Sequence, residues 1–377
     1  MVTTPTTITD VARVAGVSKA AVSFALNGRP GVAADTRERI LAVARDLGWT
    51  PSLRGRSLSV SRALAVGLVI ARTPETLGAD PFFGAFISGS ETVLSERGYA
   101  LMLQVVSDEA SEHESYRRLA ANGRVDGVFL TDMRVDDLRP QLLADLALPT
   151  VVIGPAPAGG PWSAVGIDDQ PGIVAAVEHL VALGHRNIAH VSGPTEFVHS
   201  VSRRDAWAVA ISEAGLLPGP CIAADFSAQD GANATSALLD LAEPPTAIVY
   251  ANDLMAIAGM STAIGRGVEV PAQLSITGFD DAPLSAHLQP ALTTVRTDVV
   301  GWGRAAAIQL LALIDQVAGP EIDLPAPEFV IRASTAPPGH PGDPGDPGDP
   351  GHPGHPGHGA PSKERRGSAS ILHRKKS

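Results

Sequence analysis

Residues 8–28 read ITDVARVAGVSKAAVSFALNG, and this stretch decides how the first part of the chain folds. It holds two short runs with helically spaced apolar residues, separated by Gly16-Val17-Ser18. Glycine readily adopts the left-handed conformation that ends a helix, and serine accepts a hydrogen bond from the first free amides of the next helix. The spacing therefore predicts two short helices joined by a tight turn, which is the helix-turn-helix arrangement.

The flanking residues complete a small helical unit. Thr7-Ile8-Thr9-Asp10 has the form of a capping box, in which a threonine and an acid three residues later satisfy the amides of a helix start. The second helix is expected over residues 19–26, where Asn27-Gly28 ends it, and a third over about 35–47. By spacing alone, the three helices also fit an ordinary bundle.

Charge is distributed unevenly along the 377 residues, whose formal net charge is −11. Residues 1–62 carry nine Lys and Arg against four Asp and Glu, a net charge of +5. Residues 63–338 carry 14 against 32, a net charge of −18, and residues 339–377 carry six against four, a net charge of +2. A small basic segment on a large acidic body is typical of a module that meets nucleic-acid phosphates, although basic N-terminal segments are also often merely solubilising.

Three runs make the helical unit specific: ITDVARVAGVS at 8–18, VSFALNG at 22–28 and TRERI at 36–40. Together they closely resemble the headpiece of the LacI/GalR family of DNA-binding transcriptional regulators. The resemblance implies that the second helix enters the major groove of DNA. It places the DNA-contacting residues of the headpiece at Thr7, Ser18, Lys19, Ala20, Ala21, Ser23, Phe24 and Asn27.

Lys19 and Ala20 hold the two positions that mainly select bases in the family. Ala20 offers only a methyl group, so Lys19 carries most of the polar readout. Phe24 departs from the family, many of whose members have arginine there. Because phenylalanine cannot grip a guanine edge, the family's operator sequence does not transfer to this chain. Ala33 replaces a common capping serine, at a cost of about 1 kcal/mol.

Residues 50–62 connect the helical unit to the rest of the chain and could form a plain flexible linker. The resemblance instead implies a hinge helix that forms on DNA, pairs with its copy in a dimer and inserts a leucine into the minor groove. Arg56 and Leu58 hold the matching DNA-contacting positions, and Leu58 is the expected wedge. Ordering on DNA would couple DNA occupancy to the conformation of the body.

Beyond residue 62, short apolar runs alternate with amphipathic segments, which predicts parallel sheets covered by helices. Strands are expected near 64–70, 100–106, 127–130, 150–153, 164–167, 187–191, 221–226, 247–250 and 275–278. Helices are expected near 84–97, 110–121, 136–145, 170–183, 203–214, 230–241 and 253–265. The predicted fold class is α/β, with an all-α headpiece followed by two doubly wound lobes that bind ligands at the carboxyl ends of their strands.

Common enzyme signatures are missing from the body, including the dinucleotide-binding and Walker A motifs, Gly-x-Ser-x-Gly and Cys/His metal spacings. Asp168-Asp169 and Asp280-Asp281 could supply an acid and a base. Neighbouring carboxylates on an extended segment point in opposite directions, so each pair is expected to offer one inward acceptor. We therefore expect neither catalysis nor a cofactor. The single cysteine, Cys221, excludes an internal disulfide.

Four stretches of the body, at 165–168, 183–189, 250–253 and 277–281, extend the resemblance and are similar to the periplasmic-binding-protein fold as well. The resemblance implies that polar groups hold a small effector while aromatic rings cover its apolar faces. The implied effector-binding residues are Phe82, Phe83, Asp168, Arg203, Phe226, Asn252 and Asp280. Phe82 and Phe83 could instead be core residues, and Asp168 could simply cap the following helix. His185 is expected to be structural.

The domain boundaries follow from these assignments. We expect a headpiece at 1–49, a hinge helix at 50–62, an effector-binding and dimerisation domain at 63–336, and a disordered tail at 337–377. The lobes are discontinuous, with lobe 1 at about 63–160 and 295–320 and lobe 2 at about 161–294 and 321–336. The tail holds Pro-Gly-Asp and Pro-Gly-His triplets, for which disorder is expected and weak metal binding by histidines is the alternative.

The resemblance implies a homodimer that binds a pseudo-palindromic operator in double-stranded DNA, and we expect it to be released by a small polar effector, a sugar or derivative. A cytoplasmic location without a membrane partner is expected, because no apolar run reaches 18 residues and the N-terminus lacks the features of an export signal. The alternatives are a repressor that needs a co-repressor, an activator, and a sugar-binding or enzymatic α/β protein.

Overall fold

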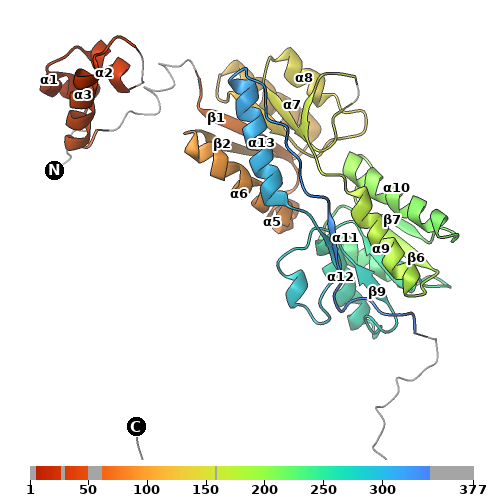
Figure 1. Ribbon diagram of the computed structural model, residues 1–377. Coiled ribbons are helices and arrows are strands. Elements are labelled where there is room, and N and C mark those ends of the chain that lie inside the picture. The colour runs from red at the N-terminus through yellow and green to blue at the C-terminus, as the bar shows by residue number, and fades with distance from the viewer. Residues whose placement is uncertain (1–5, 27–29, 50–61, 158, 340–377) are drawn as a thin grey trace, which may run out of the picture. The chain divides into compact units, whose positions relative to one another are not determined.

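The computed structural model describes residues 6–26, 30–49, 62–157 and 159–339 (Figure 1). Asn27, residues 50–61 of the predicted hinge, which include Arg56 and Leu58, and the tail from residue 340 lie outside the described residues. Among the helices within those ranges, none has the length and apolar character needed to span a bilayer.

Three helices form the headpiece: α1 (Ile8–Ala15), α2 (Lys19–Leu26) and α3 (Ala34–Asp46). The predicted turn between α1 and α2 is confirmed, because Gly16 has a left-handed φ of 66° and the Ser18 hydroxyl accepts the Ala21 amide at 3.1 Å. The predicted capping box at Thr7 and Asp10 is confirmed. Asp10 accepts the Thr7 amide at 2.9 Å, and the Thr7 hydroxyl also donates to the same carboxylate at 2.7 Å.

A small apolar core joins these three helices. It consists of Val11, Ala12, Ala15, Val22, Ala25, Ile40 and Ala44. These residues recur at helical spacing, so each helix turns one face inward. The opposite face of α2, with Lys19 and Ala20, is left exposed.

Lobe 1 is built on a parallel sheet in the order β2-β1-β3-β4-β5. The strands are β1 (Ala65–Ala71), β2 (Ala100–Val106), β3 (Gly127–Leu130), β4 (Thr150–Ile153) and β5 (Ser163–Val165). Its helices are α5 (Pro74–Ala79), α6 (Pro81–Glu96), α7 (Glu109–Ala121), α8 (Arg139–Asp145) and α13 (Val299–Ile314). α6 and α13 share one core with the sheet, and α7 and α8 share another (Figure 1). Strands covered on both faces read as the continuous apolar runs seen in the sequence.

Lobe 2 has a second parallel sheet, in the order β7-β6-β8-β9. The strands are β6 (Ile188–Ser192), β7 (Cys221–Ala223), β8 (Ala247–Tyr250) and β9 (Ser275–Thr277). Its helices are α9 (Gln170–Ala182), α10 (Val198–Glu213), α11 (Ala228–Leu239), α12 (Asp253–Gly265) and the short η1 (Ser285–His287). An antiparallel ribbon of β10 (Thr294–Arg296) and β11 (Glu328–Val330) accompanies this lobe. His185 is structural, since its ring contacts the Thr246 and Ser275 hydroxyls at 2.9 and 3.0 Å.

The predicted lobe boundaries need two corrections. Lobe 2 does not begin near residue 161, because β5 pairs with β4 in the lobe 1 sheet and the first crossing follows Val165. Lobe 2 does not resume at 321 either, because Ile322 and Leu324 still pack against the lobe 1 core. A three-residue strand carries no pattern that assigns it to one of two sheets, which explains the first error.

A close crossing of α6 and α13 closes one face of lobe 1. At Gly89 of α6, an added Cβ would overlap the backbone carbonyl of Val300, and at Gly303 of α13 it would overlap that of Phe86. The two helices therefore approach so closely that only glycine fits at either crossing point.

We expect Gly89→Ala to lower the free energy of unfolding by about 3 kcal/mol, because the new methyl group meets backbone atoms that cannot move aside. Gly84 is the matched control on the same helix, since its added Cβ meets nothing within 4 Å. Gly84→Ala should be neutral or stabilise by about 0.5–1 kcal/mol through helix propensity. Urea unfolding of both variants measures this, and equal changes would contradict the close crossing.

Candidate functional site

A cavity of about 710 Å³ lies between the two lobes. Its walls come largely from segments that follow strands: Arg72 after β1, Asp132 after β3, Asn252 after β8 and Asp280 after β9. The carboxyl ends of parallel strands open at one edge of each sheet, so both sheets present such segments to the cavity. The structure brings all seven predicted effector residues to this cavity: Phe82, Phe83, Asp168, Arg203, Phe226, Asn252 and Asp280.

Arg203 of α10 is held firmly in the wall of the cavity. Its Nε and Nη2 atoms lie 2.8 and 2.7 Å from Oδ2 of Asp169, and Nη1 donates to the Ala251 carbonyl at 2.6 Å. The guanidinium carbon stands 3.7 Å from the ring centroid of Phe279, a cation–π contact. Arg203 is thus charge-paired and held in place where it lines the cavity.

Asp280 contributes a carboxylate that has no ion-pair partner among the described residues, at a left-handed φ of 112°. Burial raises its pKa well above the ordinary value, and Asp253, Asp80 and Asp169 raise it further, while Arg203 opposes them. The neighbouring Asp281 turns away and binds Arg296 and Arg332 at 2.7 and 2.5 Å. The expectation of one inward acceptor is confirmed for this pair.

The expectation is wrong for Asp168-Asp169, because both residues line the cavity. Asp169 pairs with Arg203, while Asp168 Oδ1 accepts the Gln170 amide at 3.1 Å. The chain bends at Asp169, whose ψ of −19° is helical, so the alternation of an extended strand does not apply.

Stacked rings form the lobe 2 side of the cavity. His199 lies between Phe197 and Phe226, with ring centroids 5.6 and 5.4 Å away and interplanar angles of 9° and 15°. Burial lowers the pKa of His199 to about 3, and Arg203 lowers it too, so the imidazole is neutral at physiological pH. Gly193 is required beside this stack, because an added Cβ would overlap the Phe226 ring.

A second aromatic group faces the cavity from lobe 1. Phe82 meets Phe83 and Trp302 edge to face at 5.3 and 5.7 Å, and the Trp302 indole donates to the Val165 carbonyl at 2.7 Å. Phe83 is 3% exposed, so it belongs to the core as well as to the cavity wall. The cavity therefore has an aromatic surface on each lobe.

Asn252 and Asp168 also act as helix caps. Asn252 Oδ1 accepts the Met255 amide at 2.9 Å at the start of α12, and its Nδ2 donates to the Phe226 carbonyl at 3.1 Å. The alternative reading of Asp168 as a cap matches its contact with the Gln170 amide. Both side chains retain hydrogen-bonding capacity toward the cavity.

Sequence reasoning missed Arg72, Asp132, Asp80, His199 and Trp302. Arg72 Nε and Nη2 each lie 2.8 Å from the Asp132 carboxylate, and this pairing holds the pKa of Asp132 below its ordinary value although burial opposes it. Asp80 caps α6 by accepting the Phe82 amide at 2.9 Å. A usable signal existed for Arg72 and Asp132, because each closely follows a strand. Trp302 had none, since it reaches the cavity from the missed helix α13.

In the headpiece, the predicted DNA-contacting residues form an accessible surface around α2. Thr7, Ser18, Lys19 and Ala20 are exposed, and Phe24 is 38% exposed. Ala21 and Ser23 are half-buried. The exposed face of α2 is free of the headpiece core, as a helix that enters a groove requires.

Comparisons with known proteins match both parts of the chain. Residues 7–52 match the family described as bacterial regulatory proteins, lacI family, and residues 177–335 match the periplasmic binding protein-like domain. The HTH-type transcriptional regulator CelR of Thermobifida fusca is 33% identical over 318 residues, covering 83% of this chain and 92% of the relative. The repressor CytR of Escherichia coli is 30% identical over 352 residues, covering 88% and 97%.

Solved structures give the same result. The Lac repressor dimer bound to operator and the anti-inducer ONPF superposes with a TM-score of 0.77 at 27% identity, covering 88% of this chain and 100% of that one. A CelR–cellobiose complex superposes with a TM-score of 0.65 at 31% identity, covering 87% and 99%.

We expect Asp280→Asn to stabilise the protein at pH 7 by roughly 2–4 °C in Tm. The Asp280 carboxyl binds its proton more tightly in the folded chain than in the unfolded chain. The free energy that this bound proton contributes to folding is therefore lost as pH rises from about 4 through the raised pKa of Asp280. The gain from asparagine should therefore shrink toward pH 4. Asp168→Asn, at an exposed position, is the control and should change Tm by less than about 1 °C. A gain that is independent of pH would contradict the assignment.

Proposed function

The chain belongs to the LacI family of bacterial regulatory proteins and is a DNA-binding transcriptional regulator rather than an enzyme, and we propose that it is a repressor released from its operator by a neutral sugar or sugar derivative. It acts as a homodimer in the cytoplasm, where it meets its operator DNA. The Lac repressor dimer on its operator supports the dimer for this chain. The proposed DNA-contacting set is the exposed face of α2 together with the hinge residues Arg56 and Leu58.

The charge balance of the cavity carries the effector part of the proposal. Both arginines that line it are already paired, Arg72 with Asp132 and Arg203 with Asp169. Asp80, Asp168 and Asp280 face it as well, while no lysine is among the described lining residues. A phosphate or carboxylate ligand would find no unpaired cation there.

A polyhydroxylated ligand fits the same surroundings. Carboxylates accept hydroxyl protons, and the remaining N–H groups of Arg203 donate to hydroxyl oxygens. The rings of Phe82 and Phe226 on opposite lobes offer flat apolar surfaces to the C–H faces of a sugar ring. Cellobiose, which occupies the similar CelR, is a ligand of this kind.

We expect Lys19→Ala to weaken binding to the specific operator by about 10- to 100-fold, because Lys19 is the main polar group of α2 that can reach base edges. Non-specific DNA should lose much less affinity. Arg13→Ala removes the same charge from α1 and is the control, since its side chain is 73% exposed and pairs only weakly with Asp10 at 3.5 Å. Gel shifts with DNA upstream of the neighbouring operon measure this. No sequence-specific, salt-sensitive complex in the wild type would refute DNA regulation by this chain.

For the effector, thermal-shift measurements of the full chain against neutral disaccharides, sugar phosphates, nucleosides and amino acids should single out neutral sugars. Asp280→Ala should abolish that shift and the sugar response while leaving operator affinity unchanged. A sugar phosphate as the best ligand, or a normal response in Asp280→Ala, would overturn the effector assignment.

A further inference from the structure

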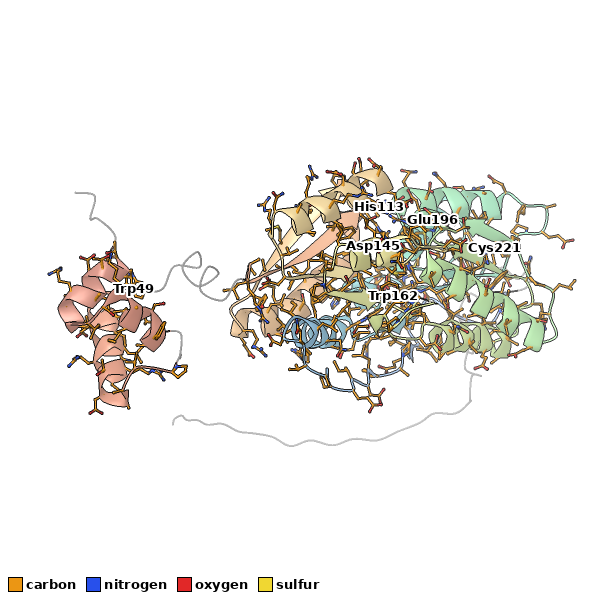
Figure 2. All side chains as sticks on the ribbon, turned by 90° about the horizontal axis from the view of Figure 1, so that it is seen from above. Trp49, His113, Asp145, Trp162, Glu196 and Cys221 are labelled. Atoms are coloured by element: carbon orange, nitrogen blue, oxygen red, sulfur yellow. The ribbon has the colours of Figure 1, made fainter. Side chains whose placement is uncertain are left out.

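A short antiparallel bridge joins the two lobes beside the cavity, in addition to the chain crossings. Arg134 of lobe 1 pairs with Phe197, the residue before α10 in lobe 2. The Val135 amide donates to the Glu196 carbonyl, and the Val198 amide donates to the Met133 carbonyl, both at 2.8 Å. Figure 2 shows Glu196 where the lobes meet, whereas Cys221 lies within lobe 2.

Side chains reinforce the bridge on its cavity side. Asp132, two residues before Arg134, holds Arg72 through two bonds of 2.8 Å. The guanidinium of Arg72 crosses to lobe 2, where it lies 4.9 Å from the Phe197 ring centroid and 5.2 Å from that of Phe226. The same lobe 1 segment thus contacts lobe 2 through its backbone and, by way of Arg72, through two rings.

A buried ionic cluster fixes this segment to lobe 1. Arg139 is 1% exposed and donates to Glu112 Oε1 at 2.7 Å, to the Asp132 carbonyl at 2.6 Å and to Asp137 Oδ2 at 2.5 Å. Glu112, also 1% exposed, accepts Arg134 Nη2 at 2.8 Å through its other oxygen. One carboxylate on α7 therefore binds both the start of α8 and the bridging residue itself.

The backbone that contains Asp132 and Asp136 is strained, and the buried ionic cluster of Glu112 and Arg139 helps to hold it in that conformation. Asp132 and Asp136 have left-handed φ values of 51° and 56°. Residues other than glycine rarely adopt this conformation, and it persists where the surroundings over-determine it. The contacts of Asp132, Asp137 and Arg139 supply that constraint.

We propose that residues 131–139 form an inter-lobe latch, and that Glu112 and Arg139 are positioning residues that hold the latch in register with residues 196–198. Neither Glu112 nor Arg139 lines the cavity. The latch ties Arg72 and Asp132 of the cavity wall to the relative placement of the lobes. Its consequence for effector binding therefore rests on the proposed function. The latch itself is a property of the fold.

Hydrogen exchange of the full chain, without effector or DNA, tests the latch. Glu112→Gln removes the charge that pairs with Arg134 and Arg139, so the Val135 and Val198 amides should exchange at least about tenfold faster. Amides of β1 and β8 should be unchanged. Glu114→Gln makes the same change on the exposed face of α7, where the side chain is 57% exposed, and should leave both amides protected. If Glu112→Gln does not fold, Arg134→Gln, which keeps the Arg139–Glu112 pair, should show the same two increases.

A disulfide provides a rescue that a general loss of stability would not show. Val135 and Glu196 are both exposed and oppose each other in the bridge, and Cys221→Ser removes the single native thiol. Oxidised Val135→Cys/Glu196→Cys in the Glu112→Gln background should restore slow exchange at Val198. Unchanged exchange in the single variants, or no rescue on oxidation, would overturn the latch. A chain that binds no sugar would refute the proposed effector and leave these results untouched.

Discussion

Parallel strand pairing within each lobe is the constraint on which the rest of the structure depends. Because the strands of a sheet run in one direction, their carboxyl ends open at one edge, where irregular segments begin. Arg72, Asp132, Asn252 and Asp280 each closely follow a strand and reach the cavity for that reason. On one face of the lobe 1 sheet, the glycine crossing holds α6 and α13 in close contact with each other.

Charge pairing in the cavity explains why a stable fold can carry so many ionised groups there. Asp132 and Asp169 compensate the two arginines, and both pairs are largely shielded from water. Asp280 has no such compensation, and burial raises its pKa at a cost to stability near neutral pH. Such a cost in stability is typical of a binding residue whose carboxylate finds its hydrogen-bond partners in the ligand rather than in the fold.

Much of this could be predicted from the sequence, and the failures have physical causes. The headpiece helices were predictable because their ends carry local signals at Gly16 and Ser18. The strands with continuous apolar runs were predictable, whereas β10 and β11 are too short to carry a pattern, and β5 was expected as a strand but not in the lobe 1 sheet. All seven predicted effector residues line the cavity, whereas His199 and Trp302 reach it from helices and owe their place to tertiary packing. The Glu112–Arg139 cluster looks in the sequence like ordinary surface charge.

The proposed release of the operator by a sugar requires that the cavity and the headpiece be thermodynamically coupled. Reciprocity then requires sugar and operator to change each other's affinity by the same factor. Fluorescence anisotropy with labelled operator, with and without saturating sugar, measures one side, and calorimetry of sugar binding with and without operator measures the other. We predict that sugar raises the operator Kd at least about tenfold and that operator raises the sugar Kd equally. A sugar that binds tightly in the cavity and leaves the operator Kd unchanged would contradict the account.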